Sequence, residues 1–204
     1  KPLSDKEVSF ISNSLAEYQV IFFKNQRIEP SEHREFALNF GSLQTHPAYP
    51  TVDGYPEITI LENDRDNPSK IEEWHTDMTF REIPPLGSIL IGRIVPPKVG
   101  ATLFGSLSKA YESLPEKMKL KLGSLSAVHS FEYGFKESLA EPGGRERLKQ
   151  ALIDNPPVTH PVIRTHPING RKSIFVNKLF TSHINEVNEE ESKEILSFLF
   201  EHIK

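Results

Sequence analysis

The spacing of apolar residues changes along the chain, from helical periodicity at both ends to short β-like runs between them. Apolar positions recur on one helix face after Ser4, which has capping-box spacing to Glu7, and again after Asn188, which has the same spacing to Glu191. Another helix is expected over 31–41. The chain should therefore fold as an α+β protein, with helices flanking a sheet of short strands.

Runs of β-branched and aromatic residues, separated by Pro and Gly, predict the strands of the middle region. Asn169-Gly170 lies between two such runs and predicts a hairpin turn, because Asn and Gly tolerate positive φ. Helical patterns interrupt the strands around 108–122 and 145–153. The expected strands are 20–23, 58–61, 88–95, 101–104, 125–131, 162–164 and 174–176.

Length and composition narrow the classes of function. A chain of 204 residues suits a single domain, which we expect over 1–204. The absence of Cys excludes thiolate ligands and disulfides, which leaves His, Asp and Glu to bind a metal and fits a reducing cytoplasm. A net charge of -4 argues against a nucleic-acid partner, and the longest apolar runs are shorter than a membrane span. A cytoplasmic protein that binds a small molecule is the better expectation.

His75 and Asp77 form the pattern with the clearest chemical potential. Side chains two residues apart in an extended strand emerge on the same face, so both could reach one metal ion. An imidazole and a carboxylate can occupy adjacent corners of an octahedron, and one further His would complete the facial triad of non-haem iron(II) oxygenases. His-x-Asp also arises by chance in a chain with 8 His, so the pattern alone is weak.

Several separated motifs resemble the taurine dioxygenase family over nearly the whole chain. They are the segments 46–50 (HPAYP), 74–80 (WHTDMTF), 84–85 (PP), 102–103 (TL), 160–167 (HPVIRTHP) and 175–177 (FVN). The resemblance implies a double-stranded β-helix, or jelly-roll, core flanked by helices. It also implies an oxygenase that uses iron(II), 2-oxoglutarate as cosubstrate and dioxygen.

The resemblance implies roles for individual positions as well. His75 and Asp77 match the proximal metal ligands, and Thr102 matches a residue whose hydroxyl helps to hold 2-oxoglutarate. His46 matches the residue that hydrogen-bonds the sulfonate of the substrate. Phe and Tyr are usually core residues, so a core role is an equal alternative for the aromatic positions among those that match the pocket. The positions that match the substrate pocket are Tyr49, Ile71, Met78, Gly134, Phe135 and Phe180.

The chain departs from the taurine-specific pattern in three places. Ile71 and Gly134 stand where taurine-specific members carry Asn and Ser, which removes polar groups from the amine end of the pocket. An alkanesulfonate without an amine, or an alkyl sulfate, is therefore a rival substrate. The family's distal His and its Arg residues have no counterpart before Lys204, so we expect a chain truncated at both ends that lacks the C-terminal part. Histidines inside the chain that are poor candidates for the missing ligand are His129, His160, His166, His183 and His202.

The activity expected from the resemblance is hydroxylation of the carbon next to sulfur in taurine or a related alkanesulfonate. The product would break down to an aldehyde and sulfite, whereas a sulfate ester would release sulfate. We also expect a homo-oligomer, either a dimer or a tetramer. Two alternatives are a zinc hydrolase, whose general base would have to come from the loop 62–73, and a non-catalytic binding protein on the same fold.

Overall fold

The chain divides into two compact units in the computed structural model, which describes residues 2–66, 68, 73–96 and 100–204. The first unit comprises Lys1–Ser69 and Leu86–Phe104, and the second comprises Lys70–Pro85 and Gly105–Lys204. No helix in the described part of the chain is both long enough and apolar enough to span a bilayer.

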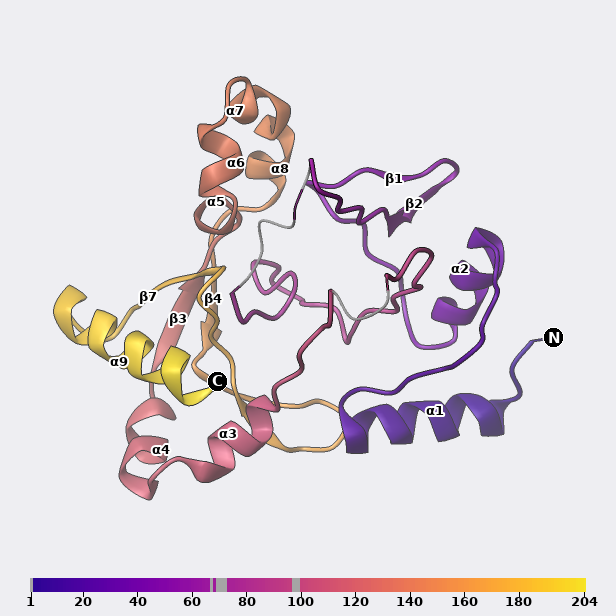
Figure 1. Cartoon of the computed structure of the whole chain (residues 1–204). Helices are drawn as coiled ribbons and strands as arrows, with labels where there is room; N and C mark the ends of the chain where they lie inside the picture. Colours follow the sequence, from indigo (N-terminus) through magenta and orange to yellow (C-terminus); the bar gives the residue numbers. More distant parts are fainter. Residues whose placement is uncertain (1, 67, 69–72, 97–99) are drawn as a thin grey trace. The chain divides into compact units, whose positions relative to one another are not determined.

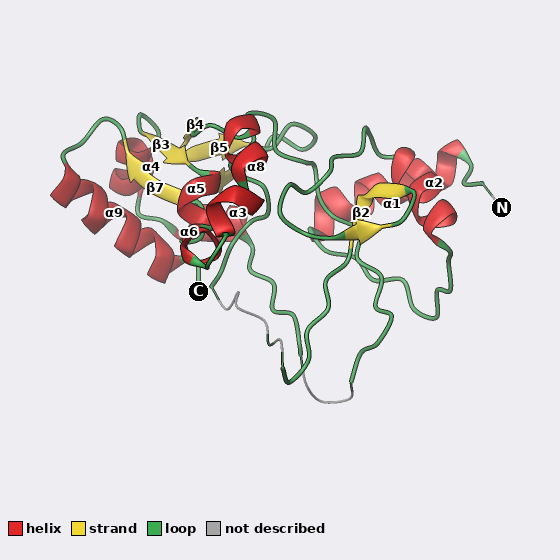
Figure 2. Ribbon diagram, turned by 90° about the horizontal axis from the view of Figure 1, so that it is seen from above, coloured by secondary structure: helices red, strands yellow, loops and turns green. Residues whose placement is uncertain are grey.

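The described residues of the first unit form two helices and one short strand pair (Figure 2). Helix α1 (Asp5–Tyr18) begins with the predicted capping box: Glu7 N–H donates to Ser4 Oγ at 3.4 Å, and Ser4 N–H donates to Glu7 Oε2 at 2.7 Å. Helix α2 (Pro30–Leu38) starts with Pro at its first position, where the missing N–H costs nothing. The short strands β1 (Thr51–Val52) and β2 (Tyr55–Thr59) pair antiparallel.

Three strands expected in the first unit are not formed by the described residues. The segments 20–23, 88–95 and 101–104 have no strand structure where they are described. Many of their apolar side chains are exposed, such as Phe22 at 73% and Leu90 at 71%. A β-like composition becomes a strand only when a neighbouring strand accepts its hydrogen bonds, and no described segment pairs with these three.

The second unit is organised around an antiparallel sheet of three strands in the order β4-β3-β7. The central strand β3 (Ser126–His129) pairs with β4 (Val158–Pro161) on one side and with β7 (Thr181–Ile184) on the other. Helix α9 (Glu189–His202) lies beside β7 (Figure 1). The hydrophobic core of this unit consists of Leu114, Leu122, Leu125, Ala127, Val162, Ile174, Val176, Ile184, Ile195, Leu196 and Leu199.

Helix α9 and the predicted hairpin both form as the sequence indicates. The side chain of Asn188 accepts from Glu191 N–H at 2.9 Å, and the apolar stripe of α9 is buried. Strands β5 (Ile163–Thr165) and β6 (Lys172–Ile174) pair antiparallel around the turn, where Gly170 has φ +69°.

Short helices fill the rest of the second unit. The 108–122 pattern becomes two helices, α3 (Leu107–Ser113) and α4 (Glu116–Leu122). Pro115 separates them, because Pro lacks an N–H and disfavours a helical conformation at the preceding residue. The other helices are α5 (Phe131–Gly134), α6 (Lys136–Ala140), α7 (Gly144–Arg147) and α8 (Lys149–Asp154).

The double-stranded β-helix implied by the resemblance is not formed by the described residues. Their sheets contain two, three and two strands, and together with the helices they make a mixed α+β structure. The fold class is therefore as predicted, while a closed jelly-roll is not seen in this part of the chain.

Candidate metal-binding site

His75 and Asp77 lie in a loop of the second unit rather than in the predicted extended strand. Asp77 begins a turn in which Arg81 N–H donates to the Met78 carbonyl at 3.0 Å. The two side chains nevertheless converge, since His75 Nε2 is 3.2 Å from Asp77 Oδ1. The expected backbone conformation was wrong, but the two potential ligands do face each other.

The orientation of the His75 ring is set by the backbone. Its Nδ1 lies 2.8 Å from the Glu73 carbonyl oxygen, which can only accept, so Nδ1 carries a proton. This leaves Nε2 facing Asp77. The hydrogen bond with Asp77 raises the pKa of His75; burial opposes that effect, and the Glu73 carbonyl adds to it. A metal ion bound between the two side chains would compete with the proton on Nε2.

The spacing of the two donor atoms fits a shared divalent cation. Metal–ligand bonds of about 2.1 Å at a right angle place two donors about 3.0 Å apart. The observed 3.2 Å is close to that value, and the His75 and Asp77 side chains are 28% and 66% exposed. In the described ranges no group of three or more His, Cys, Asp or Glu could hold a metal. The loop therefore brings together two potential donors, and a facial triad would need a third.

Two other histidines, His160 and His202, make hydrogen bonds within the second unit. His160 lies inside β4, not at a strand end, and its Nε2 is 3.0 Å from the carbonyl oxygens of Thr79 and Arg81. His202 Nε2 is 2.9 Å from the Ala110 carbonyl oxygen. These hydrogen bonds to backbone carbonyls fix the orientation of both rings.

A buried polar cluster lies directly beyond the His75–Asp77 loop. The Thr79 hydroxyl accepts a hydrogen bond from Asn177 Nδ2 at 3.0 Å and lies 2.9 Å from His129 Nδ1. The three residues are at most 2% exposed. Burial, helped by the neighbouring His160, lowers the pKa of His129 to about 3, so the ring is neutral. Sequence reasoning assigned no role to Thr79, because its partners are 50 and 98 residues away.

Two of the predicted pocket residues, Gly134 and Phe180, are in contact. A Cβ added to Gly134 would lie 2.4 Å from Phe180 Cδ1 and 3.1 Å from the Leu179 carbonyl oxygen. The Phe180 ring is 3% exposed, and its centroid is 5.0 Å from that of Phe80 and 6.2 Å from that of Phe135. Phe180 therefore occupies the space that a side chain at position 134 would need. Met78, another predicted pocket residue, lies two positions before Phe80 in the sequence and is also buried.

Three predicted site residues belong to the first unit. The His46 and Tyr49 rings lie 4.5 Å apart between centroids. Ala48 N–H donates to His46 Nδ1 at 3.2 Å, so the neutral ring carries its proton on Nε2, a suitable donor to an anion. Thr102 is exposed in a segment without regular structure. Ile71, the remaining predicted pocket residue, lies outside the described residues.

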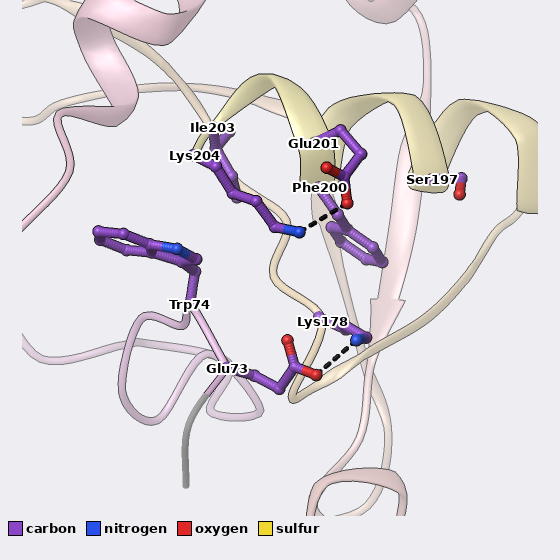
Figure 3. A pocket seen from close by; sticks show the side chains of 8 residues that line it. All are labelled: Glu73, Trp74, Lys178, Ser197, Phe200, Glu201, Ile203 and Lys204. Atoms are coloured by element: carbon purple, nitrogen blue, oxygen red, sulfur yellow. Dashed lines mark hydrogen bonds and ion pairs between the residues drawn. The ribbon is translucent and has the colours of Figure 1, made fainter.

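A pocket of about 160 Å³ in the second unit borders the segment that leads into His75 (Figure 3). Trp74, Phe200 and Ile203 contribute apolar surface to its wall. Two ion pairs lie along it, Lys178 with Glu73 and Lys204 with Glu201. The pocket thus combines apolar surface with balanced charge beside the potential ligands.

The whole chain, residues 1–204, matches the family model described as "Taurine catabolism dioxygenase TauD, TfdA family". The alkylsulfatase of Acinetobacter baylyi is 38% identical over 182 residues, which cover 87% of this chain and 57% of that protein. The alpha-ketoglutarate-dependent sulfate ester dioxygenase of Pseudomonas putida is 31% identical over 200 residues, covering 96% of this chain and 65% of that protein. The chain therefore spans less than two thirds of the length of either relative.

A solved structure shows the same fold. The crystal structure of AAD-2 in complex with Mn(II) and N-oxalylglycine matches with a TM-score of 0.74 at 29% sequence identity. The match covers 100% of this chain and 72% of that one.

Proposed function

Because the chain belongs to the TauD, TfdA family of taurine catabolism dioxygenases, we propose that the full-length protein is an iron(II)- and 2-oxoglutarate-dependent dioxygenase. The observation that carries the proposal is the 3.2 Å approach of His75 Nε2 to Asp77 Oδ1, with Nδ1 tied to a backbone carbonyl. An imidazole and a carboxylate at this spacing suit iron(II), which with 2-oxoglutarate supplies the oxidation of a C–H bond by dioxygen. The solved relative that holds Mn(II) and N-oxalylglycine supports this choice of metal site.

The proposal requires a third ligand outside the described residues. We assign it to a His in the rest of the full-length protein, together with Arg residues for the cosubstrate, because the chain spans only part of its relatives. In the same proposal the full-length protein completes a double-stranded β-helix and forms a homo-oligomer. Thr102 holds 2-oxoglutarate through its hydroxyl, and His46 donates from Nε2 to the anionic group of the substrate.

The proposed substrate is an organic anion that contains sulfur, either taurine or another alkanesulfonate, or an alkyl sulfate ester. Hydroxylation of the carbon attached to the sulfonate or sulfate group gives a product that breaks down to an aldehyde and sulfite or sulfate. The contact of Phe180 with Gly134 favours substrates without an amine, because it places a ring where a polar side chain would otherwise stand. The names of the two relatives, an alkylsulfatase and a sulfate ester dioxygenase, favour the ester in particular.

Succinate formation in the full-length protein tests the reaction class. The wild type, supplied with iron(II), 2-oxoglutarate and an alkyl sulfate, should produce succinate and aldehyde in equal amounts. His75→Ala should abolish succinate formation, because the two protein ligands that remain would no longer hold the metal. His183→Ala is the matched control, since that exposed ring contacts Ser182 and is expected to leave activity unchanged.

Two outcomes would refute the proposal. Full activity in His75→Ala would show that His75 is not a metal ligand. Tightly bound zinc without any 2-oxoglutarate turnover would support the hydrolase instead. Substrate choice is tested separately by comparing kcat/KM for taurine, an amine-free alkanesulfonate and an alkyl sulfate. A preference for taurine would contradict the argument from Gly134 and Phe180.

A further inference from the structure

The loop that carries His75 and Asp77 is held on both sides by two adjacent residues, Asn177 and Lys178. After the loop, Asn177 Nδ2 donates to the hydroxyl of Thr79 at 3.0 Å. Before the loop, the Lys178 ammonium group forms an ion pair with the Glu73 carboxylate (Figure 3). One turn of the chain therefore contacts both flanks of the potential metal-binding pair.

The direction of the Asn177 amide is fixed by its own surroundings. Its Oδ1 accepts a hydrogen bond from Phe180 N–H at 2.9 Å, and its backbone N–H donates to Thr181 Oγ1 at 3.0 Å. Because the amide oxygen is engaged by a donor, the amide nitrogen must point the other way, toward Thr79. The Asn177 side chain is thus preorganised to donate to the Thr79 hydroxyl before any ligand binds.

Thr79 is anchored by more than this one bond. Its hydroxyl lies 2.9 Å from His129 Nδ1, and its carbonyl oxygen accepts from His160 Nε2 at 3.0 Å. Thr79 and Asn177 are 1% and 2% exposed. Breaking a buried hydrogen bond leaves a polar group that water cannot satisfy, so the Thr79 anchor is costly to displace.

The backbone between the anchor and Asp77 is unusual. Met78 has φ +54°, a conformation that residues with a side chain rarely adopt, and it is buried. Such a backbone persists only where the surrounding contacts hold it. Met78 lies between Asp77 and the anchored Thr79, so we expect the Thr79 anchor to help set the direction of the Asp77 side chain.

The other flank acts through the backbone of Glu73. Its carbonyl oxygen accepts from His75 Nδ1 at 2.8 Å, while its carboxylate pairs with Lys178. The ion pair is about half exposed, at 55% for Lys178 and 47% for Glu73, so we expect it to contribute less than the buried bond.

We propose that Asn177 and Lys178 are positioning residues for the metal-binding pair. Asn177 acts on Asp77 through Thr79, and Lys178 acts on His75 through Glu73. This inference rests on the proposed function, because it assigns the spacing of the two ligands to contacts that never touch the metal. Groups of this kind change metal affinity about 10- to 100-fold when they are lost.

The test measures Mn(II) binding to the full-length protein by electron paramagnetic resonance. Thr79→Val keeps the shape of the side chain but removes the hydroxyl, and it should raise the dissociation constant about 10-fold or more. Thr79→Ser retains the hydroxyl and should restore binding to within about 3-fold of the wild type. A purely structural role would lower the fraction of protein that binds, whereas a positioning role changes the dissociation constant itself.

Lys178→Met should weaken binding a few-fold, and Lys121→Met is its matched control. Lys121 forms a comparable surface pair with Glu191 at 2.7 Å and contacts neither flank of the loop, so its loss should leave binding unchanged. If Thr79→Val does not fold, the comparison of Lys178→Met with Lys121→Met tests the positioning role by itself. Wild-type affinity in Thr79→Val, or equal effects of the two Lys substitutions, would overturn the inference. A wild type that binds no Mn(II) and makes no succinate would refute the proposed function, and the positioning role with it.

Discussion

Acid should destabilise the second unit through the buried ring of His129. Burial, together with smaller effects of the nearby His160 and Arg164, lowers the pKa of this ring to about 3. In the unfolded chain the ring titrates near its ordinary value of about 6.5. Between these two pH values the unfolded form binds a proton that the folded form does not. The free energy of unfolding should therefore fall as the pH drops from 6.5 toward 3, and His129 should have no such effect above 6.5.

The size of the effect follows from the two pKa values. At pH 5 the unfolded ring is protonated and the folded ring is not, which corresponds to a loss of about 2 kcal/mol relative to pH 8. With a urea dependence of about 2 kcal/mol per molar, the unfolding midpoint should shift by about 1 M. Burial also lowers the pKa of His160, which acts in the same direction.

The contribution of His129 is isolated by comparing the wild type with His129→Asn at pH 8 and pH 5. Asn keeps a polar group near Thr79 but does not titrate. Urea unfolding followed by circular dichroism should show that the variant loses about 2 kcal/mol less than the wild type between the two pH values. Carboxylates and His160 contribute to the pH dependence of unfolding in both proteins, so their contributions largely cancel in the comparison. Equal losses would show that burial does not keep the His129 ring neutral, and the reasoning would fail.

Other substitutions and treatments have outcomes that the structure defines. Gly134→Ala places a Cβ 2.4 Å from the Phe180 ring and should cost about 1–3 kcal/mol in urea unfolding; an unchanged midpoint would mean that the ring moves freely. Leu199→Ala removes a fully buried side chain from the core and should cost about 2–5 kcal/mol in the same assay. Asn188→Ala removes the 2.9 Å cap of α9 and should cost about 1 kcal/mol, with no change expected in Asn188→Asp. Chelation of the metal should stop succinate formation by the full-length protein, and iron(II) should restore it; activity that survives chelation would contradict the proposed function.

Local signals predicted the elements whose hydrogen bonds are local. The capping residues of α1 and α9 satisfy N–H groups within the same turn, and the Gly170 hairpin closes over a few residues. The segment 88–95 has an equally clear β composition, but a strand needs a partner whose identity the segment does not encode. The described residues offer it none, so its apolar side chains stay exposed.

The same distinction applies to the candidate site. His75 and Asp77 are two residues apart, so their spacing alone suggested that both could reach one ion, even though the predicted strand is a loop. The bond from Asn177 to Thr79 joins residues 98 positions apart, and no local pattern links them. Position 134 is similar, because the reason for Gly there is the ring of Phe180, which only the fold brings close.

The sequence distances spanned by the Thr79 contacts also bear on the order of events during folding. Partners 50, 81 and 98 residues away can assemble only after β3, β4 and the turn at Asn177 have closed around the segment. Contacts between residues so far apart in the sequence carry a large entropic cost of loop closure, so we expect them to form late in folding. A metal held by His75 and Asp77 would accordingly load onto a finished chain rather than nucleate it, unlike the zinc of a zinc finger. Newly made protein should pass through a folded, metal-free stage.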